Sequence, residues 1–192
     1  MNKKDTVVFD LDGTLLDTLE DLKNSVNYAM TQCGYPEHTL DEVRRYVGNG
    51  ILLLMQRAIP GGKDDPNFDK AFTLFKEHYG KHCNDTTKSY AGIMELLHTL
   101  KENNIKIAIV SNKADFAVKE LNAIYFKDLI PVAIGEKESE GIRKKPAPDT
   151  VIEALKQLGS TAENSVYIGD SDVDIETCLL YTSDAADEED SV

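Results

Sequence analysis

TVVFDLDGTLLDT, at residues 6–18, is the most informative segment of the chain. Its first four residues, Thr6–Phe9, are β-branched or aromatic, a pattern typical of a buried parallel strand. Asp10 and Asp12 follow the strand, and Gly13 then allows a sharp turn. Side chains at the carboxyl end of a strand in an open α/β sheet project into the crevice where ligands bind. We therefore expect this strand to deliver two carboxylates to one small site.

The close pair of carboxylates predicts a bound cation. Two bare carboxylates at this spacing repel each other and raise a pKa unless positive charge lies between them. An EF-hand calcium loop is excluded, because that loop needs a preceding helix and a glycine at its sixth position. Here a strand precedes, and Gly13 is only the fourth residue counted from Asp10.

The rest of the chain alternates strand and helix patterns. Gly159 directly follows the last helical pattern, as a C-terminal signal should. This alternation predicts an α/β fold, an open parallel sheet with flanking helices. The later strands are expected at residues 106–110, 131–134 and 165–168, and the helices at 93–103, 115–121 and 150–158.

A long excursion separates the first two strands. Residues 16–84 carry no convincing strand pattern, but Phe68, Phe72, Phe75 and Tyr79 recur near helical spacing. So long a connection is better explained by an inserted helical module than by a loop. We therefore expect a discontinuous core, residues 1–15 and 85–177, interrupted by a helical module at 16–84.

The last residues break this pattern. The string at 178–187 is similar to a translated transposase-type sequencing adaptor. We therefore expect the natural C-terminus to have been lost and residues 178–192 to be a non-native tail, the alternative being an acidic disordered tail. The strand at 165–168 would then be an unprotected sheet edge, and the chain less stable and more prone to aggregate than its parent.

Three further groups of polar residues have the expected chemistry. Ser111 and Asn112 follow a strand, where a hydroxyl can donate to a phosphate oxygen, although Ser-Asn after a strand is more often ordinary turn chemistry. Lys145 lies in KKPAP, residues 144–148, a segment that proline stiffens but that also fits a solvated loop. Asp170 and Asp174 follow the last strand, and Asp170 can join Asp10 on a hard cation such as Mg²⁺. Asp174, one helical turn on, can bond Lys145 or a metal-bound water, whereas Asp172 fits a helix N-terminus.

Taken together and in this order, residues 5–177 resemble the four motifs of the phosphatases of the haloacid dehalogenase superfamily. The resemblance implies a Rossmann-like core with Asp10 as nucleophile, Asp12 as general acid and base, and Ser111 and Lys145 as ligands of the phosphoryl group. It also implies a Mg²⁺ site formed by Asp10, Asp170 and the Asp12 carbonyl, and a helical cap that selects substrate. Asn112 joins the substrate-binding set, and Gly13, Thr14 and Asp174 support the site.

Two segments are most similar to the phosphoglycolate phosphatase branch: residues 10–18 and RYVGNG at 45–50. This branch implies magnesium-dependent hydrolysis of small phosphate monoesters through an aspartyl-phosphate, with phosphoglycolate as the leading candidate. Arg44 or Arg45 could bind a substrate carboxylate, or could simply end a helix.

Two other functions stay open. A sugar phosphomutase of the same superfamily keeps both aspartates and shields its aspartyl-phosphate from water. A receiver domain also phosphorylates an aspartate on a parallel sheet, but needs neither Asp12 nor a helical insertion. A dehalogenase would lack the carboxylate of Asp12.

The composition limits the partners. The formal net charge of −13 disfavours nucleic acid and anionic lipid, and no apolar run approaches the length of a membrane span. Cys33, Cys83 and Cys178 are too scattered for a disulfide framework or a metal cluster. We expect a cytoplasmic monomer or homodimer that acts on a small phosphorylated metabolite.

Overall fold

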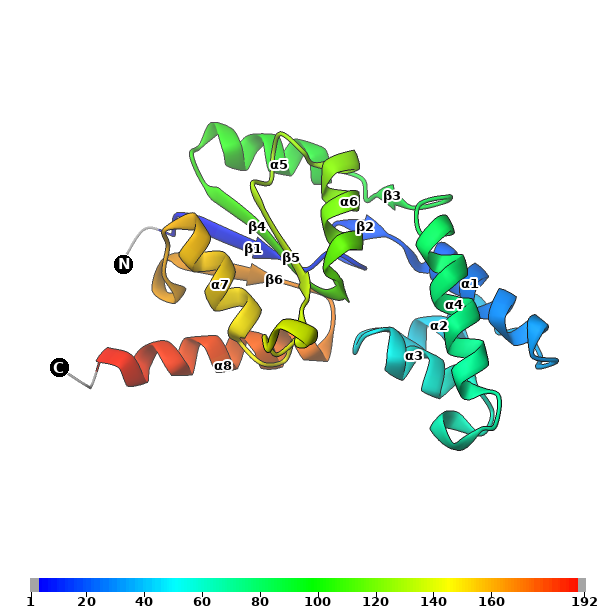
Figure 1. Ribbon diagram of the computed structural model, residues 1–192. Helices are drawn as coiled ribbons and strands as arrows, with labels where there is room; N and C mark the ends of the chain where they lie inside the picture. The colour runs from blue at the N-terminus through cyan, green and yellow to red at the C-terminus, as the bar shows by residue number, and fades with distance from the viewer. Residues whose placement is uncertain (1–3, 190–192) are drawn as a thin grey trace. The chain divides into compact units, whose positions relative to one another are not determined.

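The computed structural model describes residues 4–189. These residues divide into two compact units (Figure 1): an α/β unit, up to Leu15 and from Ser89 onward, and a helical unit, Leu16–Lys88. The segments where the chain changes unit, β2 (Leu16–Asp17) and β3 (Lys88–Ser89), pair as a two-stranded sheet. The expectation that no strand lies in 16–84 is therefore wrong at β2, because two residues are too few to show a period.

The α/β unit is built on four parallel strands in the order β5-β4-β1-β6. These strands are β1 (Thr6–Phe9), β4 (Lys106–Ala114), β5 (Val132–Glu136) and β6 (Ser165–Ile168). The predicted open parallel sheet is confirmed. Strand β1, which carries the two aspartates at its end, lies between β4 and β6.

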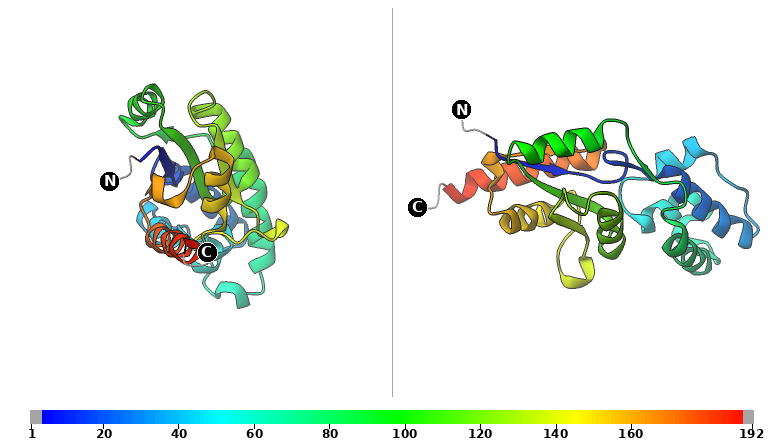
Figure 2. Two further views of the ribbon diagram at one scale, coloured as in Figure 1. Left: turned by 90° about the vertical axis from the view of Figure 1, so that its left-hand side faces the viewer. Right: turned by 90° about the horizontal axis from the view of Figure 1, so that it is seen from above.

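Helices cover both faces of this sheet. Helices α5 (Ile93–Glu102) and α6 (Asp115–Tyr125) lie on one face, and α7 (Asp149–Leu158) and α8 (Asp172–Glu189) on the other (Figure 2). Right-handed crossovers explain this arrangement. The moves from β1 to β4 and from β4 to β5 run in the same direction along the sheet, whereas the return to β6 reverses it.

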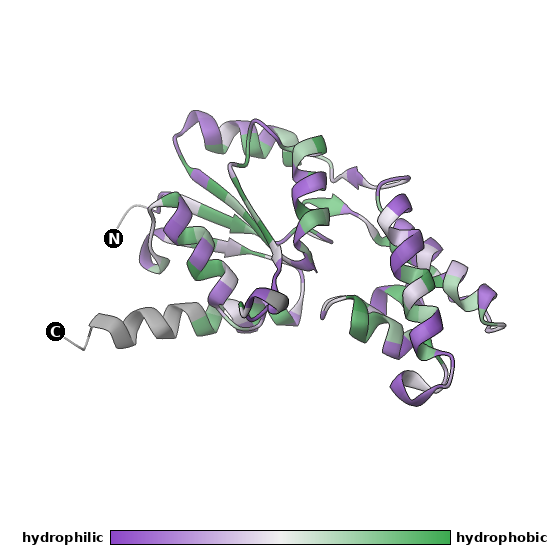
Figure 3. Ribbon diagram, in the orientation of Figure 1, coloured by the Kyte–Doolittle hydropathy of each residue, from purple (hydrophilic) through white to green (hydrophobic). Residues whose placement is uncertain are grey.

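The core of the α/β unit is apolar along the strands (Figure 3). On the face that α7 covers, Val8, Ala108 and Val110 pack against Val151 and Ala154, all at most 1% exposed. The strand residues alternate with a period of two, and the helix residues are three apart, as each element requires. This packing holds the carboxyl ends of the strands in fixed positions.

The structure differs from the sequence prediction at β4 and β5, and β5 spans Val132–Glu136 rather than residues 131–134. Strand β4 does not end at residue 110 but continues to Ala114, with a register irregularity after Val110. Ser111 and Asn112 therefore lie in extended backbone rather than in a turn. Strand β6 pairs only with β1 among the described strands, so it forms the expected sheet edge.

Helix α8 continues through the predicted tail. Its backbone is helical to Glu189, so the helix includes residues 178–189 of the expected tail. Residues 190–192 of the predicted tail lie outside the described residues.

The helical unit contains α1 (Leu19–Gln32), α2 (Leu40–Tyr46), α3 (Ile51–Ala58) and α4 (Phe68–His82). Helix α1 packs against α4, whose predicted apolar face is confirmed by the buried side chains of Phe68, Phe75 and Tyr79. Nowhere in residues 4–189 does a helix combine the length and apolar character needed to span a membrane.

Asp21 fastens the start of α1 to the segment after α4. Its carboxylate is 1% exposed and accepts the backbone N–H groups of Thr86 and Thr87, each at 2.9 Å. The hydroxyl groups of the same threonines donate to it at 2.6 and 2.7 Å. These hydrogen bonds to one buried carboxylate hold the first and last segments of the helical unit together.

Candidate active site

Parallel pairing brings the predicted site residues to one edge of the sheet. Phe9, the last residue of β1, pairs with Ile109 on one side and Ile168 on the other. The N–H of Asp10 donates to the Ile168 carbonyl at 2.8 Å, which extends this pairing by one residue. Asp10 and Asp170 therefore leave the sheet together, although they lie far apart in the sequence.

Lys145 joins two of the carboxylates. Its ammonium donates to Oδ1 of Asp10 at 2.8 Å and to Oδ1 of Asp174 at 2.7 Å. The Tyr167 hydroxyl also donates to Oδ1 of Asp174, at 2.8 Å, and Ser171 donates its N–H and hydroxyl to Oδ2. The predicted bond between Lys145 and Asp174 is confirmed, and the buried network holds the ammonium in one direction.

Burial and the neighbouring charges shift the pKa values of the three ionisable groups in this network. Burial raises the pKa of Asp10 to about 6, because the loss of water outweighs the attraction of Lys145. Burial alone would lower the pKa of Lys145, but Asp10 and Asp174 outweigh it and hold that pKa above its ordinary value. Burial likewise opposes ionisation of Asp174, but Lys145, Ser171 and Tyr167 hold its pKa below the usual range. Burial therefore makes Asp10 easier to protonate than an ordinary aspartate.

Asp170 is held beside Asp10 by the loop after β1. The hydroxyl of Thr14 donates to Oδ1 of Asp170 at 3.3 Å. A Cβ atom on Gly13 would lie 2.3 Å from Oδ2 of Asp170, and the φ angle of +88° at Gly13 also favours glycine. The pKa of Asp170 is raised by partial burial and then by the neighbouring Asp174. Gly13 is therefore the residue that permits this close approach.

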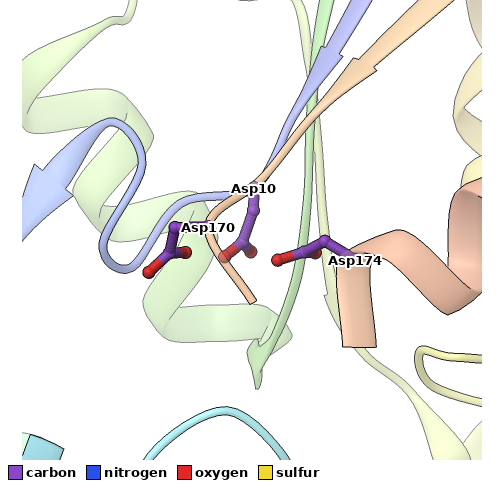
Figure 4. Close-up of side chains that lie close together, drawn as sticks. All are labelled: Asp10, Asp170 and Asp174. Atoms are coloured by element: carbon purple, nitrogen blue, oxygen red, sulfur yellow. The ribbon is translucent and has the colours of Figure 1, made fainter. Parts of the chain in front are cut away.

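The three carboxylates form a set that suits a hard cation. Asp10, Asp170 and Asp174 each offer an oxygen within 4.8 Å of the others (Figure 4). Hard divalent cations such as Mg²⁺ prefer carboxylate and carbonyl oxygens. Lys145 contacts two of these three carboxylates, Asp10 and Asp174. The donor set and its charge therefore fit Mg²⁺.

The carboxylate of Asp12 points to a different partner. Its Oδ1 accepts from the ammonium of Lys113 at 2.8 Å, and the Lys113 side chain is almost fully buried. Sequence reasoning missed Lys113 because it ended the strand at residue 110. In an extended strand Lys113 shares a side with Ser111, two residues earlier, and this spacing could have identified it.

Ser111 and Asn112 lie next to these lysines. Ser111 is 3% exposed, and its hydroxyl accepts the N–H of Lys113 at 3.2 Å. Asn112 donates from its side-chain amide to the Lys145 carbonyl at 3.0 Å, while its Oδ1 is buried without a hydrogen-bond partner. Asn112 thus fixes the segment that carries Lys145.

The remaining candidate residues are in the expected places for structural roles. Asp172 begins α8 and accepts the N–H of Val173 at 2.9 Å, as a residue at a helix N-terminus does. Arg44 and Arg45 lie in the last turn of α2, where Arg44 pairs with Asp41 at 2.6 Å. The helix-end interpretation of these arginines therefore has direct support.

Comparisons with known proteins agree with this geometry. A phosphoglycolate phosphatase from Aquifex aeolicus is 33% identical over 174 residues, which cover 88% of this chain and 78% of the relative. One from Pseudomonas putida is 31% identical over 176 residues, or 88% of this chain, but the match spans only 64% of that relative. The crystal structure of a predicted phosphoglycolate phosphatase from Haemophilus somnus superposes with a TM-score of 0.84 at 26% identity, covering 95% of this chain and 84% of that one.

A family model also matches most of the chain. The model is described as haloacid dehalogenase-like hydrolase and aligns with residues 7–180, a range that includes every proposed site residue. The four-stranded parallel sheet and the carboxylates at its edge have the placement that the resemblance in sequence implies. The chain belongs to the haloacid dehalogenase-like hydrolase family.

Proposed function

We propose that the chain hydrolyses small phosphate monoesters with Mg²⁺, through an aspartyl-phosphate, an acyl phosphate formed on Asp10. One observation carries the proposal: the Asp10 carboxylate lies 2.8 Å from the Lys145 ammonium and close to an oxygen of Asp170. Such a carboxylate can attack phosphorus while the Lys145 ammonium and the proposed Mg²⁺ offset the negative charge of the phosphate. The names of the relatives support the same class of reaction.

Three groups would hold the metal. Asp10 and Asp170 supply carboxylate oxygens, and the main-chain carbonyl of Asp12 supplies a third ligand. Asp174 lies within reach of the same position and is tied to Lys145. When bound, Mg²⁺ neutralises the phosphate and stabilises the charge that builds up on its oxygens during transfer.

Asp10 acts as the nucleophile. Its carboxylate attacks phosphorus in line with the leaving group, the bond from phosphorus to the alcohol oxygen breaks, and an aspartyl-phosphate forms. Lys145 stabilises the negative charge on the transferring group, and the Ser111 hydroxyl donates to one of its oxygens. Water then attacks the same phosphorus, which releases inorganic phosphate and restores Asp10.

Asp12 supplies and accepts the protons. In its protonated form it donates to the leaving alkoxide, and the resulting carboxylate then takes a proton from the attacking water. A correctly placed acid–base group typically contributes about 10²–10⁴-fold in rate. The carboxylate of Asp12 accepts from Lys113, a different lysine from the one that contacts Asp10.

Phosphoglycolate is the leading substrate candidate. The segments at residues 10–18 and 45–50 and the names of the relatives favour it. We assign substrate selection to the helical unit as a cap, with Arg44 or Arg45 as candidate ligands of a carboxylate. The dispersed cysteines favour a reducing compartment, and we propose the cytoplasm.

Phosphate release from a panel of esters tests the proposal. The panel contains phosphoglycolate, p-nitrophenyl phosphate and a hexose 1-phosphate, each with Mg²⁺ or with EDTA. We expect steady, Mg²⁺-dependent release that Asp10→Asn abolishes. Asp5→Asn, at the other end of β1, serves as the matched control and should keep activity.

Three results would contradict the proposal. Normal turnover by metal-loaded Asp10→Asn would exclude Asp10 as nucleophile. A single stoichiometric burst would indicate a receiver domain, and isomerisation of the hexose 1-phosphate would indicate a mutase.

A further inference from the structure

We infer that Lys113 is a positioning residue that holds Asp12 in place for proton transfer, an inference that rests on the proposed function. The Lys113 ammonium lies 2.8 Å from Oδ1 of Asp12. The side chain of Lys113 is 4% exposed and that of Asp12 is 18% exposed, so the pair is largely removed from water.

The backbone fixes both partners. Asp12 follows β1, and Lys113 lies in β4. All four residues of β1 pair with the first four residues of β4. The N–H of Lys113 donates to the Ser111 hydroxyl, which holds its main chain at the end of the strand. Lys113 is thus placed by a strand, and Asp12 by the turn that directly follows β1.

Burial of this lysine needs a compensating interaction. Lysine is seldom buried unless it is paired, because removing an ammonium from water costs several kcal/mol. Lys113 and Lys145 are the buried lysines among the described residues, with whole-residue exposures of 6% and 4%. They contact different carboxylates: Lys145 contacts Asp10 and Asp174, and Lys113 contacts Asp12.

The two buried lysines are therefore placed for different roles. Lys145 lies where the phosphoryl group would be transferred, whereas Lys113 contacts the proposed proton donor, Asp12. A displacement of about 1 Å in a catalytic group can cost about 10²-fold in rate. Loss of Lys113 should therefore impair proton donation more than phosphoryl binding.

The leaving group offers a specific readout. An alkoxide is a strong base and needs a proton as it departs, whereas p-nitrophenolate is a weak base and departs without one. The ratio kcat/KM covers all steps up to departure of the alcohol, so it excludes later hydrolysis of the aspartyl-phosphate. A defect in Asp12 placement should thus appear in kcat/KM for alkyl phosphates only.

The experiment compares Lys113→Met with the unchanged chain on ethyl phosphate, phosphoglycolate and p-nitrophenyl phosphate. We expect kcat/KM to fall about 10²-fold for both alkyl esters and by no more than about threefold for the aryl ester. Lys113→Arg should recover part of the loss, because it keeps the positive charge. Lys106→Met, at the opposite end of β4, should leave all three values unchanged.

A double-mutant cycle tests whether Lys113 acts through Asp12. In an Asp12→Asn background, Lys113→Met should cause little further loss on ethyl phosphate. Fully additive losses would overturn the inference. If Lys113→Met does not fold, the same comparison is made with Lys113→Gln, and the alkyl-to-aryl ratio must still fall.

Other outcomes also separate the possible roles. Equal losses on all three esters would overturn the inference and indicate phosphoryl binding or a purely structural role. A loss restricted to phosphoglycolate would overturn it too, and would assign Lys113 to the substrate carboxylate. Inactivity of the unchanged chain on every ester would instead overturn the proposed function, and the inference with it.

Discussion

The ammonium of Lys145 lies 2.7 Å from Oδ1 of Asp174, and both residues are almost completely buried. The same ammonium contacts Asp10, and Ser171 fixes the other oxygen of Asp174. Asp174 thus sets the direction of the Lys145 side chain before any ligand binds. The positive charge that the proposed chemistry needs is part of the folded core.

Replacing Lys145 by methionine should destabilise the protein strongly. The change leaves Asp10 and Asp174 buried without their common cation. Breaking a buried ion pair in this way typically costs about 3–5 kcal/mol. Urea unfolding in EDTA measures the loss, with Lys144→Met as the control because its pair with Glu138 is more exposed. Equal stability of the two variants would contradict the buried network.

Asp10 should make the metal-free protein less stable as the pH rises. Its folded-state pKa is about 6, above the ordinary value of 3.8, because of burial. The folded state therefore binds more protons between these values, and its stability falls as the pH rises through that window. Asp10→Asn should remove this loss and be more stable near neutral pH by up to roughly 3 kcal/mol.

Unfolding free energies at several pH values check this expectation. In EDTA the advantage of Asp10→Asn should be largest above about pH 6 and should vanish near pH 4. Addition of Mg²⁺ should stabilise the unchanged chain more than the variant. A difference that stays constant over the whole range would show that Asp10 does not titrate as stated.

Gly13→Ala should weaken metal binding by displacing Asp170. The added Cβ would lie 2.3 Å from Oδ2 of Asp170, and the φ of +88° adds backbone strain. We expect Mg²⁺ affinity to fall about 10–100-fold, as when the groups that orient a ligand are disturbed. Gly92→Ala is the matched control, because its φ of +84° is similar and no atom lies within 4 Å. Calorimetric titration with Mg²⁺ measures the affinity of both variants. Similar affinities for Gly13→Ala and Gly92→Ala would contradict the steric argument.

Asp21→Ala should destabilise the helical unit. It leaves the N–H groups of Thr86 and Thr87 without their carboxylate acceptor, and an unsatisfied buried donor costs about 1–3 kcal/mol. Glu20→Ala removes only a surface pair with Lys23 and is the control. Thermal unfolding followed by circular dichroism compares the two variants. An equally small decrease in Tm for both would show that Asp21 does not stabilise the helical unit.

The sequence was sufficient to predict the sheet and most of the site. Strands β1 and β6 begin and end where the pattern predicts, because both are short runs rich in β-branched and aromatic residues, which favour strands. Asp10 and Asp170 could be placed together because parallel strands end at one edge.

The missing details depend on contacts between distant segments. Strand β4 continues through polar residues, so hydrophobicity could not show that Lys113 lies in it. Its partner Asp12 is known only once β1 and β4 are paired. The two-residue strands β2 and β3 likewise exist only because their chain segments meet. Tyr167 gave no signal, since an aromatic residue in a strand is ordinary.

The central position of β1 has a consequence for protein synthesis. This strand leaves the ribosome first, but its neighbours β4 and β6 begin only at Lys106 and Ser165. The helical unit, by contrast, is continuous in sequence and closes around its own core. We expect nascent chains to gain protease resistance first at residues 16–88, while the strand before the proposed nucleophile gains its second neighbour only once residues 165–168 have been made. Proteolysis of ribosome-stalled chains of increasing length tests this order. Protection of β1 before residues 16–88 would contradict it.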